Sequence, residues 1–245
     1  MQLIHPERRP TTPEELASRL DLRQLARPGR PYLGVNMVSS LDGKATLDWR
    51  TKGLSSDFDR RLFHHLRTQA DAVMVGAGTA REERYGRMTK SDDLRQKRQN
   101  EGLVPDALAV VVSARLDLPP DLPLLNEPDQ RVVIATGSDA ELPGVTGDVE
   151  YARTGDDLPR LMAYLSEEHG VRSVLCEGGP TLNSHLFAAG LVDELFLTFT
   201  PKVLGGAAAL TIVAGRELVE PAEPSLISVA EHEGELYTRW RFRHG

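Results

Sequence analysis

Short, continuous apolar runs that end in glycine or serine recur along this chain, and they limit its fold more than any other feature. Four segments show the pattern: "DAVMVGAG" (71–78), "DALAVVVS" (106–113), "RVVIATG" (131–137) and "RSVLCEGG" (172–179). A strand that is apolar on both sides has to be covered on both faces of its sheet. Because parallel strands need long crossover connections, helices are expected between them. The sequence therefore predicts an α/β fold with a largely parallel sheet and helices on both faces.

Helical spacing of apolar residues predicts helices over about 57–68, 156–169 and 181–189. Ser56 stands before the first helix as a possible cap, and Gly190 follows the last helix at the position where glycine commonly ends one. These segments supply the crossovers that the parallel sheet requires.

Further strands are expected outside this repeating pattern. An apolar run predicts a strand over 32–39, and "DELFLTFTP" (193–201) alternates as a strand does. The final segment, "SLISVAEHEGELYTRWRFR" (225–243), contains two strand-like runs around Glu233 and Gly234. That arrangement predicts a C-terminal hairpin that adds antiparallel strands to one edge of the sheet.

The chain has no internal repeat and no linker that would separate domains. Residues 1–30 are predicted to form a polar N-terminal arm with a short helix opened by Thr12, and residues 31–245 a single domain. Residues 84–105 are charged, and within them "KSDDLRQKRQNEG" (90–102) predicts either a short exposed helix or a mobile loop. We expect a solvated surface excursion there and assign no function to it.

Composition narrows the choice of partners. The net charge of −7 and the pI near 5.5 argue against broad binding of nucleic acid. No apolar run approaches the roughly 20 residues that cross a bilayer, and the start "MQLIHPERRP" has no apolar signal-peptide core. We therefore expect a cytoplasmic protein whose partner is a small molecule, with neither nucleic acid nor a membrane bound.

Sulfur and metal chemistry are not expected. The single cysteine, Cys176, excludes an intramolecular disulfide, and its apolar strand predicts a buried, unreactive thiol. The histidines include no H-E-x-x-H motif, and the adjacent His64 and His65 diverge by about 100° on a helix. No metal site is predicted.

Three glycine clusters follow strand-like runs. They are Gly76–Thr79, Glu177–Thr181 and Leu204–Gly206. Loops at the carboxyl ends of parallel strands gather where ligands bind, so the clusters together predict a phosphate or dinucleotide site. Gly178 and Gly179 alone could equally form a tight turn without a ligand. The chain lacks G-x-G-x-x-G, a Walker motif and the G-x-S-x-G elbow, which favours chemistry by a bound organic cofactor, such as hydride transfer.

The motifs in combination are more specific. "VNMVSSLDGKAT" (35–46), "DAVMVGAGTA" (71–80) and "LCEGGPTLNSHLFAAGLVDELFLTFTPKVLGG" (175–206) occur in this order. They resemble the reductase domain of bacterial riboflavin biosynthesis, the C-terminal half of a bifunctional deaminase-reductase with the dihydrofolate reductase fold. The resemblance spans roughly residues 30–242. Because the deaminase signature H-x-E with P-C-x-x-C is absent, it implies a stand-alone reductase.

The resemblance implies that NADPH reduces the ribosyl group of a pyrimidine ribosylamino 5′-phosphate to a ribityl chain, as a 5-amino-6-(5-phosphoribosylamino)uracil reductase does. It also implies that the protein is a homodimer. The implied catalytic residues are Lys44, Glu177 and Asp42. The implied cofactor-binding residues are Gly76, Gly78, Thr79, Gly178, Gly179, Pro180, Thr181, Leu204, Gly205 and Gly206. The implied substrate-binding residues are Asp42, Lys44, Ser55, Ser56, Glu83, Arg84 and Glu177. Lys44 could be a ligand of the substrate or a proton donor.

One segment departs from the family pattern. After G-x-x-T the family has an acidic residue followed by Asn-Pro, whereas this chain reads "AREERYGRM" (80–88). Glu83 takes the acidic position, and Arg84 and Arg87 could be phosphate clamps or solvent-facing charges. This departure leaves a dihydropterin-type substrate open as an alternative, and a catalytically idle NADPH-binding module is a further one.

Overall fold

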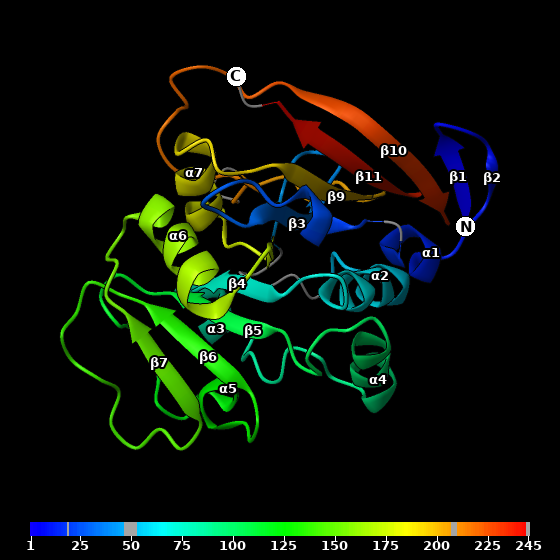
Figure 1. The fold of residues 1–245 in the computed structure, drawn as a ribbon. Coiled ribbons are helices and arrows are strands. Elements are labelled where there is room, and N and C mark those ends of the chain that lie inside the picture. Colours follow the sequence, from blue (N-terminus) through cyan, green and yellow to red (C-terminus); the bar gives the residue numbers. More distant parts are fainter. Residues whose placement is uncertain (19, 47–52, 207–209, 244–245) are drawn as a thin grey trace. The chain divides into compact units, whose positions relative to one another are not determined.

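Residues 1–18, 20–46, 53–206 and 210–243 are described by the structure, a computed structural model (Figure 1). Contacts within the chain divide it into two compact units. Unit 1 comprises Met1–Leu20, Leu33–His65 and Gly178–Gly245, and unit 2 comprises Asp21–Tyr32 and Leu66–Glu177. Each unit is therefore built from segments that lie far apart in the sequence.

Unit 2 contains a parallel sheet. Its strands, in spatial order, are β8 (Ser173–Cys176), β4 (Ala72–Gly76), β5 (Leu108–Val112), β6 (Arg131–Ala135) and β7 (Asp148–Ala152). All four pairings between neighbours are parallel. Strands β4 and β8 are apolar and buried along most of their length, as the continuous apolar runs require.

Short helices connect the strands of unit 2. They are the 3₁₀ helix η1 (Leu22–Leu25), α3 (Ala77–Glu82), α4 (Asp92–Asn100), α5 (Pro123–Asn126) and α6 (Leu158–His169). One side of the sheet packs into an apolar core that includes Val75, Val111 and Ile134 from the strands, with Met88 and Leu124 from the connections. Gly170 ends α6 in the left-handed conformation that glycine adopts readily.

Unit 1 is mainly antiparallel. Its strands, in spatial order, are β2 (Arg9–Pro10), β1 (Gln2–His5), β10 (Pro224–His232), β11 (Glu235–Phe242), β9 (Glu194–Thr200) and β3 (Tyr32–Ser40), whose first residue belongs to unit 2. Only β3 and β9 pair in parallel. Its helices are α1 (Pro13–Ser18), α2 (Asp57–Arg67), whose last two residues belong to unit 2, and α7 (Pro180–Ala188).

The predicted fold class is confirmed: a mostly parallel sheet with helices and an antiparallel C-terminal hairpin. Helices α2, α6 and α7 begin and end within two residues of the predicted bounds. The hairpin turns at Glu233 and Gly234, both with positive φ. Cys176 is buried, as predicted.

Strand β7 was not predicted from the sequence, and two other segments differ from expectation. The N-terminal residues Gln2–His5 form strand β1 and pair with β10, a role that four residues with one buried side chain did not indicate. Residues 92–100 form the expected short helix, α4, but Arg98 within it is 0% exposed. The expectation of a wholly solvated excursion is therefore wrong, because a buried guanidinium anchors it.

Within the described residues, no helix is long and apolar enough to cross a membrane. The same part of the chain contains no group of three or more His, Cys, Asp or Glu side chains that could hold a metal ion.

Candidate functional site

The turn that follows β3 is held by the side chain of Ser40. Its hydroxyl accepts a hydrogen bond from the Lys44 backbone N–H (2.9 Å) and donates to Asp42 Oδ1 (2.5 Å). Gly43 has φ +81°, which an L side chain rarely adopts. These contacts fix the backbone that leads into Lys44.

Asp42 ties this turn to the glycine loop that follows β9. Its two carboxylate oxygens accept hydrogen bonds from the backbone N–H groups of Leu204 (3.1 Å) and Gly205 (2.7 Å). The Ser40 hydroxyl, followed by those two N–H groups, lowers the pKa of Asp42 to about 2. The carboxylate is therefore ionised at neutral pH, and the structure brings together two motifs that the sequence had singled out separately.

Lys44 is half-buried next to this junction. Among the described residues, its ammonium group has no hydrogen-bond or ion-pair partner. A cation without an internal partner is available to an anionic or hydroxyl-bearing ligand.

Ser55 and Ser56 both donate to carboxylates within unit 1. Ser55 Oγ donates to Asp59 Oδ2 (2.6 Å), and Ser56 Oγ donates to Glu235 Oε2 (2.6 Å). Burial raises the pKa of Asp59 above its ordinary value, and the charge of Glu235 adds to that effect. A hydroxyl carries one proton, so in this arrangement both serines can accept a hydrogen bond from a ligand but cannot donate one to a phosphate.

Gly178 and Gly179, the two glycines before α7, are required for different reasons. Gly178 has φ +84°, and a Cβ there would lie 3.0 Å from Met37 Sδ. Backbone conformation and packing thus account for Gly178 without a ligand, the alternative that the sequence left open. Gly179 is the N-cap of α7 and has no side chain to satisfy the first N–H groups, and Pro180 starts the helix.

The first turn of α7 is fixed by the loop around Ile212–Ala214. Pro180 O accepts from Ala214 N (3.1 Å), and the amide of Asn183 donates to Ile212 O (2.8 Å). Thr181 is exposed on this turn. An exposed helix N-terminus without a side-chain cap can bind a phosphate through its backbone N–H groups.

Gly205 and Gly206 have φ values of +67° and +83°, and a Cβ at either would meet no atom within 4 Å. These glycines are required by backbone conformation, and the space beside them is open to a ligand. In unit 2, Gly76 is the N-cap of α3, Gly78 likewise has open space beside it, and Thr79 O accepts from Glu83 N (3.0 Å).

Glu177 ends unit 2 in a buried ion pair with Arg67. Nε of Arg67 donates to Oε1 (2.6 Å) and Nη2 to Oε2 (2.7 Å), and the two side chains are only 4% and 2% exposed. Burial acts to lower the pKa of Arg67, but the charge and hydrogen bonds of Glu177, together with Tyr85, outweigh this and raise it. Such a bidentate pair holds the carboxylate plane in one orientation.

Two further groups complete this cluster. The Tyr85 hydroxyl donates to Glu177 Oε2 (2.8 Å), and Nη1 of Arg67 donates to Met88 O (2.8 Å). Burial and the charge of Glu177 raise the pKa of Tyr85 well above its ordinary value, so the phenol stays a donor. Tyr85 lies in the segment that departs from the family pattern.

Sequence reasoning missed Arg67 and Tyr85. A signal for Arg67 was present, because it lies four residues after Phe63 on the apolar face of a helix. An arginine on a buried face needs a counter-charge. No local pattern pointed to Tyr85.

The charged residues of the departed segment have separate partners. Glu83 caps the end of α3 with its backbone. Arg84 forms an exposed ion pair with Asp121 (3.2 Å). Arg87 is neither a solvent-facing charge nor available to a phosphate, because it pairs with Asp106 (2.7 Å) and Glu127 (2.8 Å).

The candidate site residues are thus divided between the units. Unit 1 holds the turn at Asp42 and Lys44, Ser55 and Ser56, the start of α7 and the loop at Leu204–Gly206. Unit 2 holds Gly76–Thr79, Glu83, Arg84 and Glu177. The structure brings Asp42 to Leu204 and Gly205, and Glu177 to Arg67 and Tyr85.

Comparison with known proteins gives consistent matches. The family model described as the RibD C-terminal domain matches residues 31–234. A protein of Archaeoglobus fulgidus named 2,5-diamino-6-ribosylamino-4(3H)-pyrimidinone 5′-phosphate reductase is 36% identical over 197 residues, covering 78% of this chain and 90% of that protein. A protein of the same name from Methanothermobacter thermautotrophicus is 30% identical over 202 residues, covering 79% and 88%.

The fold is also found in a solved structure. The crystal structure of a pyrimidine reductase-like protein from Corynebacterium diphtheriae matches with a TM-score of 0.74 and 22% identity, covering 96% of this chain and all of that one. At this identity the likeness supports the fold alone.

Proposed function

The chain belongs to the RibD C-terminal domain family, and from this premise we propose that it is a reductase that converts the ribosyl group of a pyrimidine ribosylamino 5′-phosphate to a ribityl group in riboflavin biosynthesis. The observation that carries the proposal is the 36% identity to a reductase of that description, over 90% of the relative's length.

The relatives' names favour one substrate. They specify the 2,5-diamino-pyrimidinone, whereas the sequence motifs led us to expect 5-amino-6-(5-phosphoribosylamino)uracil, the deaminated form. We propose that the 2,5-diamino compound is the substrate, so that reduction precedes deamination. The reacting ribosylamino phosphate is the same in both compounds, and the chemistry at the sugar does not change.

NADPH is the proposed cofactor, and it would supply the hydride that reaches the sugar carbon. The residues fit a phosphate-bearing dinucleotide: α7 begins without a side-chain cap, and Gly205 and Gly206 leave open space beside the backbone. In unit 2, Gly76, Gly78 and Thr79 are proposed as further cofactor contacts.

The chain's own side chains divide the remaining work. Lys44 is proposed to bind the substrate's phosphate or a sugar hydroxyl, because its ammonium group has no internal partner among the described residues. Asp42 is proposed to hold the Leu204–Gly205 backbone beside Lys44, since both of its oxygens accept hydrogen bonds from that backbone. Glu177 is proposed to accept a hydrogen bond from the substrate with its remaining lone pair, oriented by Arg67.

Other predicted substrate ligands keep narrower roles. Ser55 and Ser56 are proposed to accept hydrogen bonds from N–H or O–H groups rather than to bind phosphate. Glu83 and Arg84 remain proposed substrate contacts because of their place in the sequence after the G-x-x-T motif. A phosphorylated intermediate does not cross membranes freely, so we propose that the reaction takes place in the cytoplasm.

The test is NADPH oxidation with three substrates in parallel: the 2,5-diamino-pyrimidinone phosphate, its deaminated form and dihydrofolate. Turnover of the first alone is expected. Turnover of the deaminated form alone would reverse the proposed order of reduction and deamination. Turnover of dihydrofolate alone would indicate a pterin-type reductase, and NADPH binding without any turnover would indicate an idle binding module.

A homodimer is also proposed. Strands β1, β10 and β11 of unit 1 carry the exposed apolar side chains of Ile4 (47%), Leu226 (37%) and Leu236 (37%), which a second copy could cover. Light scattering at micromolar concentration should give twice the 27.0 kDa chain mass. A monomeric mass would exclude the dimer.

A further inference from the structure

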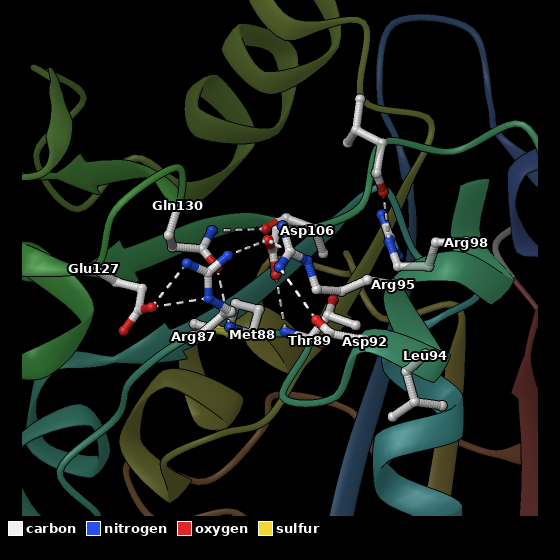
Figure 2. A network of polar contacts seen from close by, with 12 residues as sticks. Arg87, Met88, Thr89, Asp92, Leu94, Arg95, Arg98, Asp106, Glu127 and Gln130 are labelled. Carbon is white, nitrogen blue, oxygen red and sulfur yellow. Dashed lines mark hydrogen bonds and ion pairs between the residues drawn. The ribbon is translucent and has the colours of Figure 1, made fainter.

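Arg98 on α4 is a fully buried guanidinium, and all of its hydrogen bonds to the described residues go to backbone carbonyls. Nε donates to Val104 O (2.8 Å), and Nη1 donates to Arg67 O (2.7 Å) and Ala70 O (2.7 Å). Its side chain is 0% exposed. Figure 2 shows Arg98 bonded to one of these carbonyls and separate from the cluster around Asp106.

No carboxylate among the residues that the structure describes forms a direct ion pair with Arg98. Within the described part of the chain, Asp71, Asp106 and Glu101 act on it only from a distance. Burial lowers the pKa of Arg98 to about 10, so the group is still charged at neutral pH. Its Nη2 is buried without a hydrogen-bond partner among these residues. A buried cation with an unsatisfied donor lowers the stability of the fold. Hydrogen bonds to the carbonyls at and beyond the C-terminal end of α2 offset part of this cost.

Arg67 connects Arg98 with Glu177. The backbone oxygen of Arg67 accepts from Arg98, while its guanidinium holds both oxygens of Glu177. One residue therefore carries both contacts, and a shift of its backbone would move the carboxylate. The guanidinium of Arg98 reaches three carbonyls because its donors lie on separate nitrogens. A lysine at this position would have one ammonium nitrogen and could not reach all three.

The rest of the 84–105 segment is anchored around the same pair. Met88, whose carbonyl accepts from Arg67, is itself fixed by a hydrogen bond from its N–H to Gln130 Oε1 (3.0 Å). Figure 2 shows Arg87 bonded to both Glu127 and Asp106. These bonds hold the residue that directly precedes Met88. The segment is a support for the Arg67–Glu177 pair.

We propose that Arg98 is a positioning residue, which sets the place of the Glu177 carboxylate through the backbone of Arg67. The proposal rests on the proposed function, in which Glu177 contacts the substrate. Arg98 itself is buried and acts only through Arg67.

The experiment compares Arg98→Met and Arg98→Lys with the control Arg95→Met, which removes an arginine of the same helix whose side chain is 30% exposed. Arg98→Met should lower kcat for the pyrimidine substrate about 10- to 100-fold, since small misplacements of a site group have effects of this size. KM for NADPH should stay within about 2-fold, because no proposed cofactor contact is involved. Arg98→Lys should be intermediate, and Arg95→Met close to wild type.

The pathway through Glu177 is tested by repeating Arg98→Met in a Glu177→Gln background. If Arg98 acts through that carboxylate, its loss should change kcat by less than about 2-fold there. An equal loss in both backgrounds would overturn the proposal, as would an unchanged kcat in the folded Arg98 variants. If Arg98→Met does not fold, the same comparison with Arg98→Lys decides.

A readout without turnover separates this proposal from the proposed function. Hydrogen exchange of residues 66–70 and of β8 should accelerate together in the Arg98 variants. If wild-type protein reduces none of the substrates, the proposed function fails, while coupled exchange still supports the link from Arg98 to Glu177. Faster exchange at residues 66–70 with β8 unchanged would refute that link.

Discussion

Replacing Glu177 with glutamine should leave a buried arginine without its counter-charge. Arg67 and Glu177 are 4% and 2% exposed, so solvent screens their interaction little. Breaking a buried pair by removing one partner costs about 3–5 kcal/mol of unfolding free energy. In a chain of this size, about 1 kcal/mol shifts Tm by roughly 2–4 °C, which gives an expected loss of roughly 6–20 °C.

Thermal unfolding followed by far-UV circular dichroism measures this loss. The matched control is Glu101→Gln, which removes an acid paired with Lys97 (2.7 Å) but 39% exposed. Exposed pairs contribute less than about 1 kcal/mol, so the control should change little. The double variant Arg67→Met with Glu177→Gln removes both charges and should recover much of the stability lost by Glu177→Gln alone.

The electrostatic reasoning fails if Glu177→Gln destabilises the protein no more than Glu101→Gln. It also fails if the double variant is as unstable as the sum of the two single variants. Either result would mean that packing, rather than the unpaired charge, determines the cost.

Three other outcomes are expected. Lys44→Met should lower turnover of the pyrimidine substrate at least about 10-fold while NADPH affinity, measured by fluorescence, changes little; equal loss of both would contradict its role as a substrate ligand. Asp42→Ala should release the loop at Leu204–Gly205, seen as faster proteolysis there, whereas an unchanged cleavage rate would show that Asp42 does not hold it. Asp59→Asn should change the dependence of stability on pH. Because burial raises the folded-state pKa of Asp59, its contribution is present below about pH 4 and is lost as pH rises through the folded value. In urea unfolding, the free energy of unfolding of the asparagine variant should therefore rise relative to that of wild type as the pH goes from acidic to neutral. A difference between the two proteins that does not change with pH would refute this.

Local patterns were sufficient for most of the fold. Continuous apolar runs predicted β4, β5, β6 and β8, because a strand covered on both faces is made mostly of apolar side chains. Gly190 was placed correctly after α7, since the left-handed conformation that ends a helix suits glycine. The short strand β1 was missed because its pairing partner, β10, lies more than two hundred residues away.

The sequence by itself determined the fold class, the family and the identity of the motif residues, because strand and helix patterns and glycine turns depend on neighbours along the chain. Only the tertiary structure decided which side chains are partners. Asp42 meets Gly205 across 163 positions, and Arg67 meets Glu177 across 110. Hydrogen bonds and ion pairs at such separations depend on how the strands are brought together, and no local spacing records that arrangement. The same reason hid Arg98: its burial follows from the carbonyls around it, not from the charged segment in which it lies.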